Sequence, residues 1–162
     1  MSEKCIVGID PGLDGGIAVL TEVVEAFPMP VMPTGSGARR TLDLPSIREL
    51  IAGADLVIIE RQQAFPRDSK AGAFKTGEGF GMLKGLLCGL GIPHQIVSPQ
   101  TWQKDFAISS QRGDTKAQAG LACQQLFPGI DLRKSGRATK PHDGKIDALL
   151  IAEHGRRKVN GE

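Results

Sequence analysis

The sequence has little aromatic character: it contains no tyrosine, one tryptophan and six phenylalanines among 162 residues. It also lacks any run of 18 or more apolar residues, which excludes a membrane-spanning helix. Its three cysteines, Cys5, Cys88 and Cys123, are widely spaced and form no CxxC or Cys/His pattern, which argues against a zinc site. We therefore expect reduced, buried thiols in a reducing cytosol.

The net charge of +2 hides an uneven distribution. Residues 1–60 carry 4 Lys/Arg against 9 Asp/Glu, a net charge of −5, whereas residues 61–162 carry 16 against 9, a net charge of +7. A basic region of this size indicates a polyanionic partner. The length predicts a single domain over residues 1–162, because one domain usually takes roughly 100–200 residues.

Short apolar runs alternate with turn residues and with segments of helical periodicity, and there is no internal repeat. The predicted strands are 4–10, 17–21, 23–27, 55–60 and 92–97. The predicted helices are 44–53, 81–90, 99–106, 115–127 and 143–154. Loops are expected at 32–41, 61–79 and 133–141. This order predicts an α/β domain with a mixed sheet.

Four acidic residues occupy positions where an acid is costly. Asp10 and Glu60 each end an apolar strand, and Asp143 and Asp147 lie one turn apart on the last predicted helix. If that helix packs beside the sheet, the four carboxylates converge and repel one another unless cations neutralise them. Carboxylates are the ligands of hard divalent ions, and paired ions clamp the oxygens of a phosphodiester during its cleavage.

Each acid also has a structural explanation. The Asp10-Pro11-Gly12 segment is typical of a turn, Glu60 suits the end of a strand or an ion pair with an arginine, and Asp143 suits the N-cap of the last helix. The four together favour a metal centre more strongly than any one of them alone.

Four segments carry a resemblance to the RuvC family of Holliday junction resolvases, within the RNase H-like superfamily. They are GIDPGLDGGIAVL (8–20), VIIERQQAFP (57–66), DTKAQAG (114–120) and PHDGKIDALLIAEHG (141–155). The plastid type of resolvase and its phage and bacterial relatives are the most similar. That similarity runs through AFPRDSKAG (64–72), GFG (79–81), VSPQTWQKDF (97–106), LFP (126–128) and HDGKIDALLIA (142–152).

The resemblance implies an RNase H-like five-stranded mixed sheet flanked by helices. It also implies a homodimer that nicks two opposed strands of four-way junction DNA, with two Mg²⁺ or Mn²⁺ ions per active site. Asp10 would bind both ions, Glu60 one and Asp147 the other. The bacterial resolvases place the fourth acid three residues before the last one, where this chain has Gly144. Here Asp143 stands four residues before Asp147, a spacing that the plastid type shares with a histidine in place of Asp143.

Lys116 resembles the family's active-site lysine, which would contact the scissile phosphate and stabilise its developing charge; an ordinary surface lysine is the alternative. Basic residues on both sides of the acids are candidates for DNA contacts through phosphates. Together with one aromatic residue, the predicted DNA-binding set is Arg61, Arg67, Lys70, Phe74, Lys75, Arg133, Lys134, Arg137, Lys140 and Lys145.

Phe65, Phe74 and Phe80 fall in the segment after Glu60, where an aromatic ring can stack on an unpaired base. Phe74 is our candidate for such a wedge at the junction centre, and packing is the alternative for all three. We expect Trp102 to pack its helix onto the sheet. The apolar helix 81–90 would serve as a dimer interface or a core helix.

Three other functions remain open at this stage. A sugar-kinase or actin-like ATPase shares the motif around Asp10 but needs two such domains. A non-catalytic junction-binding protein and an RNase H-like nuclease acting on RNA remain compatible with the acids. The sequence shows no targeting segment. We expect a bacterial or phage-encoded protein in the host cytoplasm, or an organellar one if a leader has been removed.

Overall fold

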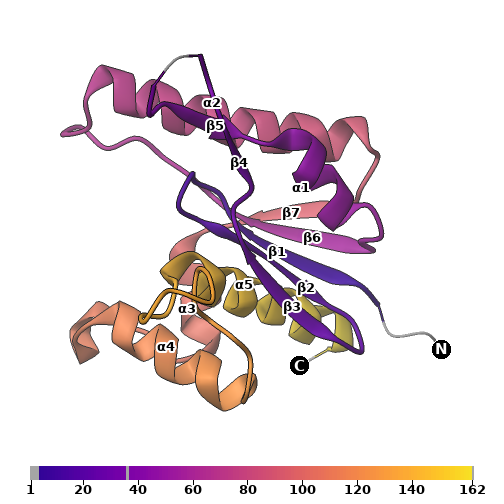
Figure 1. The fold of residues 1–162 in the computed structure, drawn as a ribbon. Coiled ribbons are helices and arrows are strands. Elements are labelled where there is room, and N and C mark those ends of the chain that lie inside the picture. The colour runs from indigo at the N-terminus through magenta and orange to yellow at the C-terminus, as the bar shows by residue number, and fades with distance from the viewer. Residues whose placement is uncertain (1–3, 36, 162) are drawn as a thin grey trace.

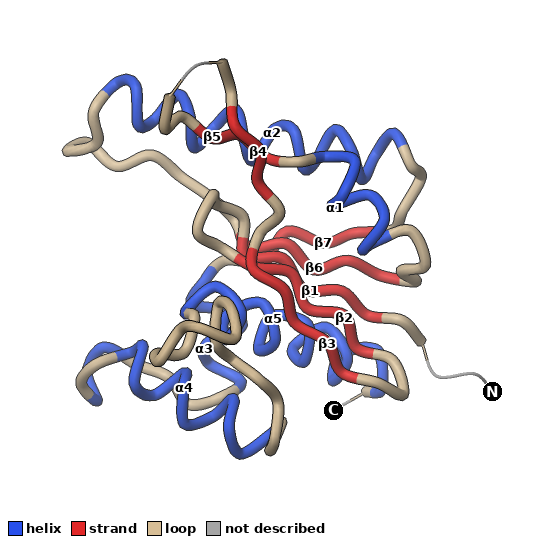
Figure 2. Tube along the Cα trace, in the orientation of Figure 1, coloured by secondary structure: helices blue, strands red, loops and turns tan. Residues whose placement is uncertain are grey.

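The computed structural model describes residues 4–35 and 37–161, and its centre is a five-stranded sheet. The strands lie in the order β3-β2-β1-β6-β7 (Figure 2). Their bounds are β1 (Ile6–Asp10), β2 (Gly16–Leu20), β3 (Val24–Pro28), β6 (Leu56–Glu60) and β7 (His94–Val97). β1, β2 and β3 form an antiparallel meander, whereas β6 pairs parallel to β1 and β7 parallel to β6. The predicted mixed sheet of five strands is confirmed.

Helices cover both faces of the sheet (Figure 1). The helices α1 (Leu44–Ile51) and α2 (Lys70–Gly89) lie on one face. On the other face, α5 (Asp143–Asn160) lies directly on the strands, and α3 (Pro99–Asp105) and α4 (Thr115–Leu126) pack against α5. A 3₁₀ turn at Ser110–Arg112 connects α3 and α4. In the described part of the chain, no helix is long and apolar enough to cross a membrane.

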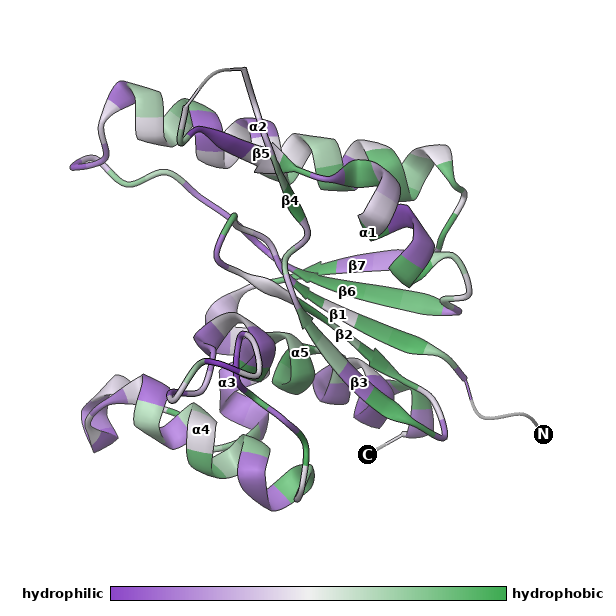
Figure 3. Cartoon of the chain, viewed as in Figure 1, coloured by the Kyte–Doolittle hydropathy of each residue, from purple (hydrophilic) through white to green (hydrophobic). Residues whose placement is uncertain are grey.

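Strand side chains point alternately to the two faces, and this alternation divides the core into two clusters. In β1, Ile6 belongs to the cluster beneath α5, whereas Val7 and Ile9 belong to the cluster beneath α1 and α2. Figure 3 shows the resulting pattern, with hydrophobic central strands between helices that mix hydrophilic and hydrophobic residues. Both faces are buried, which explains why β1 and β6 read as continuous apolar runs.

Two segments expected to be loops contain regular structure. Segment 32–41 contributes to β4 (Val31–Pro33) and β5 (Arg40–Leu42), which form an antiparallel hairpin outside the main sheet. Strands of three residues have too short a pattern to detect in a sequence. A hairpin of this kind depends on its packing against the rest of the chain.

The second correction concerns α2, which begins at Lys70 and occupies half of the segment 61–79. Its sequence KAGAFKTGEGFGMLKGLLCG contains six glycines. Each costs about 1 kcal/mol relative to alanine in a helix interior, so intrinsic propensity opposes this helix. The Ser69 cap and the burial of Leu83 and Leu87 against the sheet stabilise it. Leu83 and Leu87 identify α2 as a core helix on that side.

Two smaller expectations need correction. The last helix continues to Asn160, six residues beyond its predicted end. The three cysteines are free as expected, and Cys123 is buried, but Cys5 is half-buried and Cys88 is exposed. Cys88 lies on α2, whose buried residues are Leu83 and Leu87, so its side of the helix faces away from the sheet.

Helix α5 approaches the sheet so closely that glycines are required at the contact. A Cβ at Gly8 of β1 would lie under 3 Å from the backbone of Ala148 and Ala152. A Cβ at Gly16 of β2 would meet the backbone of Gly144 equally closely. The contact is therefore between backbones, and it sets the height of α5 above β1 and β2.

This contact predicts that Gly8→Ala destabilises the fold by at least about 2 kcal/mol, because an added methyl group would have to displace the backbone of α5 and the Cβ of Ala152. Gly120→Ala is the matched control: it lies within α4, a Cβ there meets nothing within 4 Å, and removing a helix glycine should stabilise by about 0.5–1 kcal/mol. Chemical denaturation of both variants measures the difference. Equal stability of Gly8→Ala and the wild type would contradict this account of the contact.

Candidate active site

The parallel pairing of β1 and β6 places two of the four predicted acids side by side. Ile9 is in register with Ile59, so Asp10 and Glu60 end neighbouring strands at the same edge. Because side chains alternate along a strand, Asp10 and Glu60 lie on the same face of the sheet as Ile6 and Ile58, which is the face that α5 covers. The two carboxyl groups therefore point toward the same helix.

The other two acids lie in the first two turns of α5. Asp143 is the first residue of the helix, and Asp147 follows one turn later on the same side. The N-cap is His142, whose side chain accepts a hydrogen bond from the Lys145 backbone nitrogen, so the alternative role of Asp143 as N-cap is wrong. The glycine contact of α5 with β2 at Gly144 holds this end of the helix against the sheet.

The four acids, hereafter the acidic cluster, interact electrostatically. Burial raises the pKa of Asp10 to about 8, with further increases from the charges of Asp147, Glu60 and Asp143. Burial raises the pKa of Asp147 to about 7, again with contributions from Glu60 and Asp143. The structure thus brings together all four residues that the sequence singled out. Like charges in a poorly solvated position have a high affinity for a neutralising cation.

Two side chains from the α3–α4 region engage the acidic cluster. Lys116 Nζ donates a hydrogen bond to Asp143 Oδ2 at 2.6 Å, and this interaction raises the pKa of Lys116. Lys116 lies in the first turn of α4, whose N-cap Asp114 accepts a hydrogen bond from the Lys116 backbone nitrogen. The structure therefore places Lys116 at the start of a helix and beside Asp143, as predicted.

Trp102 makes a contact that the sequence did not reveal. Its ring is buried in the α5-side core, as expected for packing, but its Nε1 also donates a hydrogen bond to Glu60 Oε2 at 2.7 Å. Burial raises the pKa of Glu60, and this hydrogen bond opposes the increase. The two residues are 42 positions apart in the chain, so only the packing of α3 beside the end of β6 brings them together.

The donor set suits a hard divalent cation, because it consists of carboxylates; Asp10, Glu60 and Asp147 are half-buried, whereas Asp143 is exposed. Across residues 4–35 and 37–161, no three Asp, Glu, His or Cys side chains are gathered tightly enough to ligate one ion as they stand. Glu60 and Asp143 instead bind Trp102 and Lys116. The residues fit a metal ion in chemistry, and the acids would have to move closer together to share one ion.

The predicted DNA-binding residues lie in two groups at the ends of elements that carry the acids. The first group follows Glu60 and continues into the start of α2, and the second precedes α5. Exposed members are Arg61, Arg67, Lys70, Phe74, Lys75, Arg133, Lys134, Arg137 and Lys140. Arg133 also pairs with Asp131 at 2.9 Å.

Lys145 departs from this pattern. It is buried, and its ammonium group donates to the backbone carbonyl oxygens of Asp131 and Arg133. Its contacts tie the segment before α5 to the helix, so the prediction that Lys145 binds DNA is wrong in this structure. The sequence does not distinguish a buried lysine in the first turn of a helix from a lysine on the surface.

The three phenylalanines after Glu60 differ in exposure. Phe74, on the first turns of α2, is 70% exposed, and Phe65 is 53% exposed. Phe80 is half-buried, and the Lys84 ammonium group lies over its ring, 4.8 Å from the ring centroid. The Phe80 ring therefore already has a partner within the protein, whereas the Phe74 ring is exposed, as an intercalating residue has to be.

No family model and no curated protein matches the sequence. Solved structures do match over nearly the whole chain. The architecture is that of the RNase H-like class, a five-stranded mixed sheet flanked by helices. Within that class the chain has the fold of RuvC. RuvC of Thermus thermophilus matches with a TM-score of 0.59 and 20% identity, and RuvC of T. thermophilus in complex with a Holliday junction substrate matches with a TM-score of 0.61 and 17% identity. Each match covers 97% of this chain and 96% of the other.

The raised pKa of Asp10 predicts how stability depends on pH without divalent ions. Because the pKa is about 8 in the folded protein and 3.8 ordinarily, the folded state binds more protons between these values. Stability should therefore fall as the pH rises from about 4 to 8. We expect Asp10→Asn to flatten this fall and to raise Tm at pH 8 in EDTA by at least about 2–4 °C, equivalent to about 1 kcal/mol.

Thermal denaturation at pH 5 and pH 8 measures this effect. Glu22→Gln is the matched control, because Glu22 is an exposed acid in the turn between β2 and β3 and should leave the pH dependence unchanged. A variant Asp10→Asn that melts at or below the wild-type temperature at pH 8 would show that Asp10 carries no electrostatic penalty.

Proposed function

We propose that this protein is a metal-dependent DNA endonuclease that resolves four-way junctions by paired, symmetric nicks. The observation that carries the proposal is the acidic cluster, formed at one edge of the sheet by Asp10, Glu60, Asp143 and Asp147, within the fold of RuvC. One of the similar structures is a complex with a Holliday junction substrate, which supports the same class of substrate for this chain.

In this proposal Asp10, Glu60, Asp143 and Asp147 would hold two Mg²⁺ or Mn²⁺ ions. Two such ions supply an activated water and stabilise both the attacking and the leaving oxygen in an in-line displacement. The products would be a 5′-phosphate and a nick that a ligase can seal. Raised pKa values of the acids imply that metal binding displaces protons and strengthens with pH.

Lys116 has a role in this scheme as a phosphate ligand. In the structure its ammonium group neutralises Asp143. With a divalent ion bound to the acidic cluster, the Lys116 ammonium group would contact the scissile phosphate and stabilise charge that develops there. The flexible lysine stem permits this exchange without a change in the backbone.

The exposed basic residues on both sides of the acidic cluster would bind the phosphates of the junction arms. Contacts of this kind position the DNA without reading its sequence, and they make affinity fall steeply with salt. Phe74, exposed at the start of α2, would insert at the junction centre. A four-way junction offers two symmetric cleavage points, so paired nicks call for two copies of this chain.

Two alternatives share the fold and the acids. A nuclease acting on RNA would cut an RNA–DNA hybrid, and a non-catalytic junction-binding protein would bind without cutting. The pairing of Lys116 with the acidic cluster favours a phosphate-processing site over a purely structural one. In such a site the carboxylates bind the metal ions and the lysine binds the phosphate of the substrate.

The direct test is incubation with a labelled four-way junction, a linear duplex of the same sequence and an RNA–DNA hybrid in Mg²⁺. We expect cleavage of the junction alone. Asp10→Asn should abolish cleavage while junction binding persists, because the carboxylate is lost and the basic surface is kept. Equal cutting of the duplex, preferential cutting of the hybrid, or full activity of Asp10→Asn would each reject the proposal.

A second prediction concerns Trp102 as a positioning residue for Glu60. Trp102→Phe keeps a buried ring but removes the Nε1 donor, and losses of this kind cost about 10–100-fold in metal affinity or activity. We expect that loss in Mn²⁺ affinity measured by calorimetry, together with a cleavage optimum shifted to higher pH. The shift follows because the hydrogen bond opposes the increase in the pKa of Glu60.

Phe127→Leu is the matched control for Trp102→Phe. Phe127 is another buried aromatic residue of the same core cluster, and its substitution should reduce stability without a change in metal affinity. Unchanged metal affinity in Trp102→Phe, with its fold confirmed by thermal denaturation, would contradict the positioning role.

A further inference from the structure

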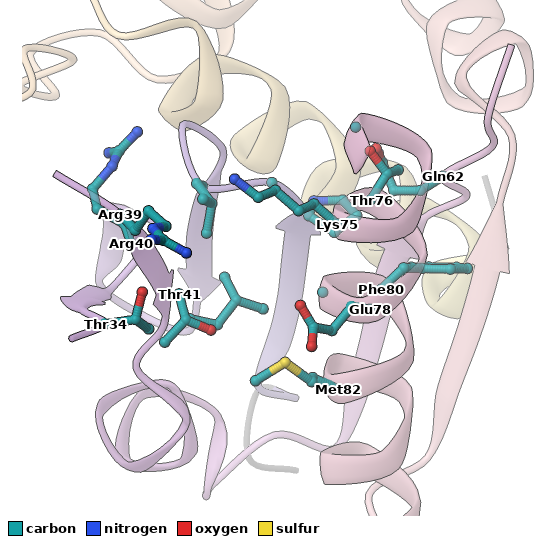
Figure 4. Close-up of a pocket in the computed structure, with 16 residues that line it drawn as sticks. Thr34, Arg39, Arg40, Thr41, Gln62, Lys75, Thr76, Glu78, Phe80 and Met82 are labelled. Carbon is teal, nitrogen blue, oxygen red and sulfur yellow. The ribbon is translucent and has the colours of Figure 1, made fainter. Parts of the chain in front are cut away.

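A cavity of about 470 Å³ lies between the β4–β5 hairpin and α2, and we call it the hairpin groove (Figure 4). It is lined by none of the four acids, but Pro11 and Gln62 are among its lining residues. Pro11 directly follows Asp10, and Gln62 lies two residues after Glu60. The hairpin groove is therefore a separate cavity whose inner end adjoins the acidic cluster. Its volume is within the range of roughly 300–1,000 Å³ typical of small-ligand sites.

The rim of the hairpin groove is positively charged. Arg39 and Arg40 come from the hairpin, and Lys75 extends toward them from α2 across the mouth of the cavity (Figure 4). Arg40 is held by Asp14 at 3.3 Å. Among the residues that the structure describes, Arg39 and Lys75 form no ion pair. Arg39 and Lys75 thus line the same cavity as unpaired cations, and two such cations are suited to one phosphate group.

The interior combines apolar surface with hydrogen-bonding groups. Leu42, which is buried, and Met82 provide an apolar wall, and the thioether of Met82 projects into the cavity (Figure 4). Thr41 and Thr76 provide hydroxyl groups, and Glu78 points its carboxylate inward from α2. Apolar walls suit the face of a nucleobase, whereas the hydroxyl and carboxyl groups suit its polar edge.

We propose that the hairpin groove binds one nucleotide of the DNA substrate, taken out of the base stack beside the strand that is cut. This inference rests on the proposed function. The phosphate lies between Arg39 and Lys75, and the base lies against Leu42 and Met82. A base pair within a duplex cannot enter a cavity of this size, whereas an unpaired nucleotide at a branch point can.

The groove also predicts a base preference. An ionised Glu78 only accepts hydrogen bonds, so it favours bases with an exocyclic amino group. Thymine is the one DNA base that lacks such a group. Cleavage should therefore be weakest where thymine occupies the position bound in the groove, and Glu78→Gln should reduce this discrimination because its amide also donates.

Gly79 offers a way to close the groove without touching its charges. A Cβ at Gly79 would lie 3.8 Å from Leu42 Cδ1, an ordinary contact, so alanine fits there. A longer side chain must extend into the cavity. Gly79→Leu is therefore the plugged variant and Gly79→Ala its matched control. Arg39→Ala removes a phosphate ligand, with Arg48→Ala as its control, because Arg48 is an exposed arginine of α1 that does not line the groove.

The experiment measures binding of a labelled four-way junction in the Asp10→Asn background, with 2-aminopurine placed in turn at each position beside the cut. We expect Gly79→Leu to weaken binding by about 10-fold or more, the loss typical of a blocked base contact. Arg39→Ala should weaken binding and lower the salt dependence by about one phosphate contact. Both controls should stay within about 2-fold of the wild type. One 2-aminopurine position should change in fluorescence, and Gly79→Leu should abolish that change.

Free deoxynucleoside monophosphates, added as competitors at millimolar concentration, distinguish a DNA strand from a free nucleotide as the occupant. Competition by free nucleotides with no 2-aminopurine signal at any position would overturn the assignment to a DNA strand. The groove inference alone is wrong if the wild type cuts junctions while Gly79→Leu and Arg39→Ala bind the junction as their controls do. Thermal denaturation of both variants shows that they are folded. If the wild type neither binds nor cuts a junction, the proposed function fails and the groove inference fails with it.

Discussion

The backbone contact between α5 and the sheet is the constraint on which the candidate site depends. Gly8, Gly16 and Gly144 leave no side chain between the helix and strands β1 and β2. This contact brings the first turns of α5 to the edge where β1 and β6 end, so that Asp147 comes within electrostatic reach of Asp10. A helix displaced by the width of one methyl group would move Asp147 away from Asp10 and Glu60. The packing of the fold and the geometry of the acidic cluster thus depend on the same glycines.

The same arrangement makes the metal-free protein electrostatically unfavourable. Burial and mutual repulsion raise the pKa values of Asp10 and Asp147 to about 8 and 7, so these acids are held partly protonated near neutral pH. Lys116 on Asp143 and the Trp102 hydrogen bond to Glu60 offset part of this cost. Divalent ions would remove the rest, and the net charge of +7 in residues 61–162 would then face a phosphate backbone without opposition from the acids.

The sequence predicted the sheet and its mixed character, and it singled out the four acids, because the central strands β1 and β6 are continuous apolar runs that each end at an acid. It did not predict the start of α2, since six glycines oppose the helix that tertiary packing imposes. The β4–β5 hairpin was not predicted because each of its strands has only three residues. The roles of Trp102 and Lys145 depend on partners far away in the chain, and no local pattern records such contacts.

Cleavage of a supercoiled plasmid that extrudes a cruciform tests the central claim most directly. A dimer with two acidic clusters makes both nicks before it dissociates, so the first product should be linear plasmid. A single nick instead releases the supercoiling and lets the cruciform reabsorb, which leaves only nicked circles. Linear product in Mg²⁺ from the wild type, and none from Asp10→Asn, is the result that this account predicts. Nicked circles alone, or cleavage independent of the cruciform, would contradict it.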